Sequence, residues 1–316
     1  MLVLSCFTAL IISACNPLAV KPDLDENSAN SSDNILNLLD PDVKTEEPAF
    51  AKAEAALNQG KSNDALFYYI KTLQFNKKNI KAMEQIASIH NRNKHPELAV
   101  KIYQDILTVD SKNLMANEGL GLYFLENGQT GKAKDYLTAA IKNNNSSWKA
   151  HNGLGVIADL TNHGAEAIAH YQTALAIQPS NPMLLNNLGY SYYLSGNEIK
   201  AKYMFNQALS YDKRYDRAIH NLALIEIKNG NFPTATALFN RIMPVQESYN
   251  NIGYICMLTG RYDVADEYLR KAIDESPVYF PKAQENLKTL STLTSRQSNS
   301  FLITHKPQLI SKAGPA

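Results

Sequence analysis

The stretch "NNLGYSYYLSGNEIKA", residues 186–201, returns in nearly the same form as "NNIGYICMLTGRYDVA", residues 250–265. The two copies begin 64 residues apart. A chain that repeats itself in phase is typical of proteins built from stacked copies of one small unit. Because 64 residues is the unit length of no common repeat, the interval between the copies should contain more than one unit.

The sequence between and before the two copies divides into frames of 34 residues, each with the same landmarks. The eighth position is Ala or Gly, and the twenty-fourth is an aromatic ring or Leu. The twentieth position is alanine in all seven frames: Ala65, Ala99, Ala133, Ala167, Ala201, Ala235 and Ala265. The frames are 46–79, 80–113, 114–147, 148–181, 182–215, 216–245 and 246–279. The sixth has only 30 residues, and we expect Pro244 to stop its second helix early, because proline lacks an N–H. One full frame plus this short one accounts for the interval of 64.

A pair of antiparallel helices explains these landmarks. Small residues lie where two helix backbones approach closely, and the large side chain at the twenty-fourth position fills the space between neighbours. The pattern resembles the tetratricopeptide repeat (TPR), over about residues 46–279. Two departures are Lys52, where an apolar residue is usual, and the missing terminal proline of the second and fifth frames.

The resemblance implies an all-α TPR solenoid, a right-handed superhelix of antiparallel helix pairs with about seven repeats. Residues 280–292 are expected to form a C-terminal capping helix, which covers the apolar face of the last repeat. We expect the tail, residues 293–316, to be disordered.

The first fifteen residues, "MLVLSCFTALIISAC", contain an apolar run that is too short to span a bilayer, which needs about 20 helical residues. The run suits the apolar region of a secretory signal. Its end, Ile12-Ser13-Ala14-Cys15, resembles the bacterial lipobox, in which the cysteine carries the lipid after cleavage. We therefore expect lipidation at Cys15. The alternatives are an ordinary signal peptide and a buried helix with a chance cysteine. No Lys or Arg precedes the run, so either the start lies upstream or the α-amine serves alone.

Residues 16–45 are rich in Asn, Asp, Ser and Pro and lack an apolar period, which predicts a flexible polar tether. In lipoproteins that this chain resembles, the residue after the cysteine directs sorting between membranes. Asn16 in place of aspartate favours the outer membrane of the bacterial envelope, with the repeats on the periplasmic side.

The sequence carries no enzyme signature, and no cofactor or small-molecule substrate is expected. With 31 Lys and Arg against 30 Asp and Glu, the chain has no strong field for nucleic acid. The "GLG" motifs at 119–121 and 153–155 follow no strand and fall at helix-packing positions, so they do not indicate a nucleotide site. Cys256 is expected to be a small core residue. No carboxylate–histidine cluster is expected to join His163 and His170. The histidines show no metal-binding spacing, and we expect them on the surface or in the groove: His90, His95, His151, His163, His170, His220 and His305.

The strongest functional signal is on the first helix of the later repeats, which lines the concave face of TPR proteins. Amides offer a donor and an acceptor together, and tyrosine combines apolar area with a polar tip, so both suit an extended peptide. We expect the side chains of this face to bind a partner and those of Asn187, Asn221 and Asn251 to face solvent, although Asn is also common at the sixth position of the repeat. The candidate residues are Asn152, Asn186, Asn187, Tyr190, Tyr193, His220, Asn221, Asn250, Asn251 and Tyr254. The fifth positions of repeats two and three are instead Glu84 and Glu118.

The lipobox, the tether and the two phrases quoted first, the second extending to "NNIGYICMLTGRYDVADEYLRKAI", together resemble the TadD-type TPR lipoproteins of the tight-adherence (Flp, type IVb) pilus machinery. The resemblance implies a protein that assists assembly of the outer-membrane secretin and the pilus, with a secretin or pilus-assembly subunit as partner. The alternatives are a type IVa pilotin and a periplasmic adaptor that recruits cell-wall hydrolases.

Overall fold

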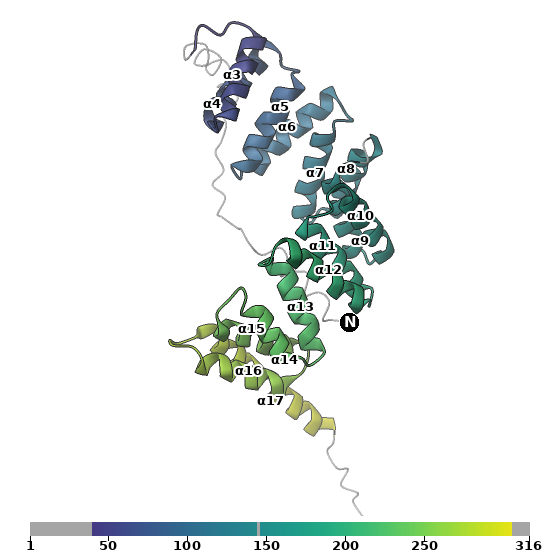
Figure 1. Cartoon of the computed structure of the whole chain (residues 1–316), viewed down its shortest axis with the longest axis vertical. Coiled ribbons are helices and arrows are strands. Elements are labelled where there is room, and N and C mark those ends of the chain that lie inside the picture. The colour runs from purple at the N-terminus through teal and green to yellow at the C-terminus, as the bar shows by residue number, and fades with distance from the viewer. Residues whose placement is uncertain (1–39, 144–145, 305–316) are drawn as a thin grey trace, which may run out of the picture. The chain divides into compact units, whose positions relative to one another are not determined.

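The structure, a computed structural model, describes residues 40–143 and 146–304, with side chains for 40–142 and 146–295. The regular structure of these two ranges consists of the α-helices α3 to α17, without strands (Figure 1). The predicted all-α class and solenoid fold are confirmed. The chain forms two compact units that divide between Pro179 and Ser180, and each unit is a succession of antiparallel helix pairs. Cys15 and the tether up to residue 39 lie outside the described residues.

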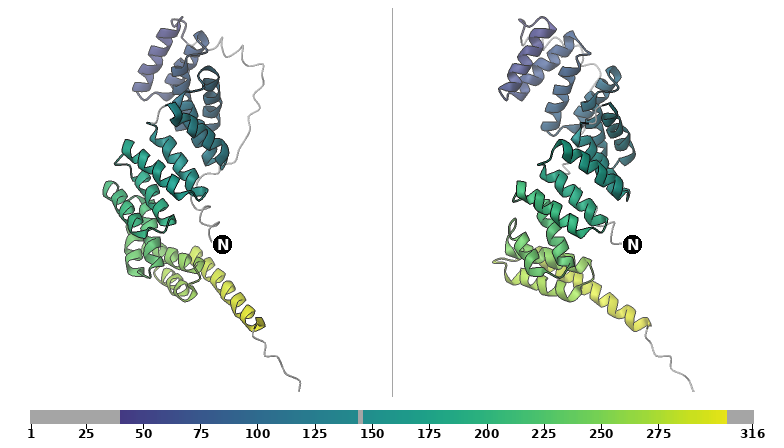
Figure 2. Two further views of the ribbon diagram at one scale, coloured as in Figure 1. Left: turned by 90° about the vertical axis from the view of Figure 1, so that its right-hand side faces the viewer. Right: turned by 45° about the vertical axis from the view of Figure 1, so that its right-hand side comes forward.

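The first unit contains four helix pairs. Their bounds are α3 Glu46–Asn58 and α4 Ser62–Phe75, α5 Ile80–Arg92 and α6 Pro96–Val109, α7 Leu114–Glu126 and α8 Thr130–Asn143, α9 Trp148–Leu160 and α10 Gly164–Ile177. The second unit contains three pairs and one long helix. Their bounds are α11 Pro182–Leu194 and α12 Glu198–Tyr211, α13 Asp216–Lys228 and α14 Phe232–Phe239, α15 Val245–Leu258 and α16 Tyr262–Asp274, and α17 Pro281–Thr304. The two views of Figure 2 show the pairs following one another along each unit.

Turn chemistry sets the helix boundaries. The first helices α5, α7, α9 and α11 start after an Asn or Ser whose side-chain oxygen accepts a backbone N–H of the first turn, as Asn113 does from Ala116. Each first helix ends two residues before a left-handed residue. That residue is glycine in five repeats, but Lys94 and Asn162 hold the same place with φ of 61° and 60°.

The core of each pair lies where small residues admit a large neighbour. All seven alanines of the twentieth position are fully buried. An added Cβ at Gly155 would lie 2.6 Å from the ring of Tyr171, and one at Gly189 would lie 2.7 Å from that of Phe205. The eighth and twenty-fourth positions of a frame are therefore in direct contact, because glycine leaves room for the large side chain.

The short sixth repeat ends differently from the prediction. Helix α14 stops at Phe239, before Pro244, and a turn follows in which Met243 N–H still bonds to Phe239 O at 3.0 Å. Pro244 adopts an extended conformation and forms the N-cap of α15. The proline therefore separates the turn from the next helix and does not itself end α14.

Both ends of the described chain also differ from the prediction. Residues 40–45 were assigned to the flexible tether, but Asp40 accepts hydrogen bonds from Lys52 at 2.6 Å and Tyr68 at 2.9 Å, and Lys71 donates to its carbonyl. Val43 is buried. At the other end, the predicted capping helix stopped at 292, whereas α17 continues to Thr304. The expected disorder is therefore wrong for 293–304.

Among the described helices, none combines the length and the apolar character that crossing a membrane requires.

Candidate partner-binding site

Nine of the ten candidate partner-binding residues lie on α11, α13 and α15, the first helices of the three pairs in the second unit. Helix α13 contacts both α11 and α15. We call the nine residues the amide–tyrosine face: Asn186, Asn187, Tyr190, Tyr193, His220, Asn221, Asn250, Asn251 and Tyr254. The tenth residue, Asn152, is half-buried on α9 of the first unit.

The amides of this face are bonded laterally, from one repeat to the next. Asn221 Nδ2 donates to Asn186 Oδ1 at 2.9 Å, and Asn186 Nδ2 lies 3.4 Å from Asn187 Oδ1. The same arrangement joins α15 to α17, where Asn286 Nδ2 donates to Asn250 Oδ1 at 2.9 Å. These bonds hold the amide groups in one orientation. The amide atoms that have no hydrogen-bond partner among the described residues are therefore held in fixed directions.

The amides of this face differ in burial. Asn186 and Asn250 are only 4% and 7% exposed, so both are parts of the helix packing. Asn187, Asn221 and Asn251 are half-buried, and Asn251 Nδ2 lies 3.2 Å from Met243 Sδ. Within the part of the chain that the structure describes, Oδ1 of Asn221 and of Asn251 accepts no hydrogen bond. The face therefore presents open carbonyl acceptors beside amides that are already bonded.

The tyrosines lie on α11 and α15, two of the three helices that carry the amides. The rings of Tyr190 and Tyr193 are 6.4 Å apart, and the ammonium group of Lys228 lies 5.3 Å from the centre of the Tyr193 ring. Tyr254 packs against the apolar core of the last repeat and is half-buried. In the described ranges, the hydroxyl groups of Tyr193 and Tyr254 have no hydrogen-bond partner. Aromatic area and open hydroxyl groups thus accompany the amide acceptors.

His220 does not join the amide cluster. Its Nδ1 donates to the carbonyl of Asp216 at 2.8 Å, and its ring packs edge-on against Phe239 of α14. The side chain is exposed, but it is held by its own helix and its pair partner.

In the first unit, the residue at the fifth position of the repeat connects consecutive repeats. The sequence did not indicate this role. Glu84 accepts from Asn113 at 2.8 Å, and Glu118 accepts from Ser147 at 2.5 Å and pairs with Lys149 at 3.1 Å. Asn113 and Ser147 are the N-caps of the following repeats. These carboxylates therefore fasten consecutive repeats, which explains the acidic residues without invoking a ligand.

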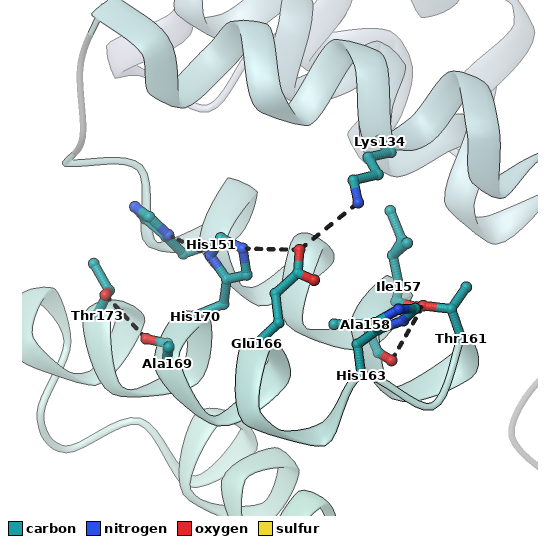
Figure 3. A network of polar contacts seen from close by, with 10 residues as sticks. All are labelled: Lys134, His151, Ile157, Ala158, Thr161, His163, Glu166, Ala169, His170 and Thr173. Atoms are coloured by element: carbon teal, nitrogen blue, oxygen red, sulfur yellow. Dashed lines mark hydrogen bonds and ion pairs between the residues drawn. The ribbon is translucent and has the colours of Figure 1, made fainter.

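Two histidines, for which surface or groove positions were expected, contact each other instead. His151 is buried on α9, and its Nδ1 lies 3.1 Å from Nδ1 of His170 on α10 (Figure 3). Glu166 lies 4.0 Å from His170 Nε2, whereas Nδ1 of His163 contacts Thr161 Oγ1 at 2.9 Å. No group of three or more His, Cys, Asp or Glu side chains in residues 40–142 and 146–295 could hold a metal ion. Cys256 is buried, and burial raises the pKa of its thiol to about 11.

Comparison with known proteins gives matches to repeat models and to solved structures. Residues 118–182 and residues 246–279 match models of the tetratricopeptide repeat, and the second match covers the same residues as the seventh frame. No curated protein matches the chain.

Among solved structures, a tetratricopeptide repeat protein from Parabacteroides merdae is 17% identical, with 78% of this chain and 98% of that chain covered and a TM-score of 0.55. This likeness shows the same fold. MamA from Desulfovibrio magneticus RS-1 is 18% identical, covering 54% of this chain and 97% of its own, with a TM-score of 0.47. YrrB, described as a TPR protein with an unusual peptide-binding site, is 18% identical, covering 58% and 95%, with a TM-score of 0.47.

Proposed function

Because the chain is built from tetratricopeptide repeats, we propose that the amide–tyrosine face of its second unit binds an extended segment of a protein partner. A stack of repeats presents one continuous row of first-helix side chains, which makes it a scaffold for protein–protein interaction. The observation that carries the proposal is the set of open polar atoms, Oδ1 of Asn221 and Asn251 and the hydroxyls of Tyr193 and Tyr254, described above.

The open atoms define the chemistry of the partner. Two carbonyl oxygens and two hydroxyl groups complement backbone N–H groups, which an extended segment presents at regular intervals. Each such bond contributes only about 0.5–1.5 kcal/mol, so binding needs several together with the tyrosine contacts. Lys228 beside Tyr193 adds one positive charge, which favours a neutral or weakly acidic segment.

We further propose that the chain is a lipoprotein anchored through Cys15 to the outer membrane and that it assists assembly of a Flp/Tad pilus and its secretin. The support is the Ile-Ser-Ala-Cys junction, Asn16 and the TadD-like phrases of the repeats. Replacing Cys15 with Ser should abolish labelling by a radioactive fatty acid. Retained labelling would refute the lipid anchor, and this result would be independent of the proposed partner site.

A capture experiment tests the binding face. The test variant combines Asn251→Ala with Tyr193→Phe and Tyr254→Phe, which removes open polar atoms but leaves the Asn221–Asn186 bond and the ring packing in place. The control combines Asn206→Ala with Tyr203→Phe and Tyr211→Phe on the exposed side of α12.

We expect wild type and control to capture a secretin or pilus subunit from solubilised envelopes, and the test variant to lose it while keeping its helicity. Capture that is equal for the test variant would refute the face. Capture of a cell-wall hydrolase in place of a pore or pilus subunit would refute the pilus assignment.

A further inference from the structure

The histidine pair of the fourth repeat lies in the first unit and has no part in the proposed partner site. His151, in the first turn of α9, is 4% exposed, and the side chain of His170 on α10 is 20% exposed. Their ring centres are 5.4 Å apart, and the closest nitrogens are the two Nδ1 atoms at 3.1 Å (Figure 3). This contact joins the two helices of one pair at a buried position.

The contact constrains where protons can be. One Nδ1 must carry a hydrogen and the other must offer its lone pair, whichever ring is the donor. A first additional proton can enter on Nε2 of the donating ring without breaking the contact. A second proton has to enter on the accepting Nδ1, after which two N–H groups point at each other and two positive rings lie side by side.

The charged groups described around His170 offset only part of this repulsion. Glu166, on α10, faces His170 Nε2 at 4.0 Å, but it is also 3.7 Å from Lys134 of α8. Lys149, on α9, pairs with Glu118 of α7, so that carboxylate is already neutralised. Asp159, near the end of α9, accepts from Tyr171 at 3.0 Å. An imidazolium at His170 therefore has to share the carboxylate of Glu166 with Lys134.

We propose that His151 and His170 form an acid-sensitive latch between α9 and α10, closed while one Nδ1 accepts and opened when both rings are charged. Opening separates the first turns of α9 from α10 and weakens the fourth repeat. Ala150 and Leu154, which flank His151 on α9, belong to an apolar cluster shared with α8, so the loss of the latch loosens that packing as well.

The direction of the pH effect follows from the native environment. Burial lowers the pKa of His170 below its ordinary value of 6.5, a positive charge on His151 lowers it further, and Lys134 adds to the effect while Glu166 opposes it. The unfolded chain consequently binds the proton at a higher pH than the folded chain does. The stability contributed by the latch is complete above pH 6.5 and is lost as the pH falls below that value.

The test uses the full chain as wild type, as His170→Asn and as the control His163→Asn. Asparagine at 170 removes the second titrating ring, and His163 is an exposed histidine in the turn between the same two helices. Hydrogen exchange of the α9 amides is measured between about pH 7.5 and about pH 4.5, across the range in which imidazole titrates, after correction for the intrinsic pH dependence of exchange. The amides of α15, a helix without histidine, serve as the internal reference.

We expect acidification to increase opening of α9 in wild type and in His163→Asn, by up to about tenfold per pH unit for each proton taken up, while α15 stays protected. In His170→Asn the opening of α9 should depend much less on pH. An unchanged pH dependence in His170→Asn, or an equal flattening in His163→Asn, would overturn the latch.

If His170→Asn fails to fold, NMR titration of the wild-type imidazoles decides the matter. Two coupled steps that begin below the ordinary imidazole range are expected, and independent titration of both rings at the ordinary pKa would overturn the proposal.

Discussion

Nδ2 of Asn221 donates a hydrogen bond of 2.9 Å to Oδ1 of Asn186, which ties the first helices of two consecutive repeats together. Asn286 on α17 and Asn250 on α15 form the same bond two helix pairs further along. The repeat pattern places Asn186 at a binding position, but its amide is used for packing between repeats. The face therefore contains two kinds of amide: buried ones that stabilise the packing, and half-buried ones whose carbonyl oxygen accepts no hydrogen bond within the described residues.

The first prediction concerns Asn186 itself. Asn186→Ala should lower the free energy of unfolding of the second unit by about 1–3 kcal/mol, because Asn221 loses its acceptor in a partly buried place. Denaturation in urea, followed by circular dichroism, measures this. Asn206→Ala, on the exposed side of α12, should change stability by less than about 0.5 kcal/mol. Equal effects of the two changes would show that the lateral bond contributes nothing.

The second prediction tests the repeat frame. Ala167 is fully buried on α10, so Ala167→Leu forces large atoms into a filled space and should destabilise the first unit by about 1–3 kcal/mol. Ala169→Leu, on the exposed side of the same helix, should be nearly neutral. Thermal unfolding of both variants provides the comparison. A tolerated leucine at 167 would contradict the contact at the twentieth position.

The third prediction is a stabilisation. Lys94 holds φ of 61°, where glycine stands in most of the other repeats, and a left-handed conformation costs a side-chain-bearing residue about 1–2 kcal/mol. Lys94→Gly should therefore raise the melting temperature of the first unit. Gly128→Ala, at the equivalent position of the next repeat with φ of 71°, should lower it although the surrounding space is open. If the left-handed backbone conformation decides the effect, the two variants must change the melting temperature in opposite directions.

The fourth prediction concerns the segment before α3. Asp40 accepts from Lys52 and Tyr68, and these hydrogen bonds, that of Lys52 foremost, hold the pKa of its carboxyl below 3.8. The contribution of Asp40 is thus present above pH 3.8 and is lost as the pH falls through its lowered pKa. Asp40→Ala should release residues 40–45 and speed hydrogen exchange in α3 at neutral pH.

Asp42→Ala is the matched control for this segment, because Asp42 is exposed. Its exchange in α3 should resemble that of wild type. If Asp40→Ala also leaves α3 unchanged, the segment is held by the burial of Val43 and not by the carboxylate.

Much of the fold could be predicted because its signals are local and repeated. Alanine at the twentieth position, glycine or alanine at the eighth and a large side chain at the twenty-fourth specify one helix pair, and seven copies in phase leave little freedom of interpretation. Helix ends are local as well, since a capping Asn and a left-handed glycine act within a single turn. The irregular places were predicted less well. Residues 40–45 are polar in composition, and only the contacts of Asp40 with α4 and Lys52 show that they are ordered.

The sequence alone therefore determined the repeat length, the number of helix pairs and the side chains that share the first-helix face, because these follow from periodicity along the chain. Only the tertiary structure decided what each polar side chain of that face does. Whether Asn186 is open or bonded depends on Asn221, 35 residues away, and the pairing of His151 with His170 depends on the packing of α9 against α10. Hydrogen-bond partners are chosen by distance in space. A pattern of period 34 predicts that equivalent positions of consecutive repeats are neighbours. It does not predict which donor bonds to which acceptor.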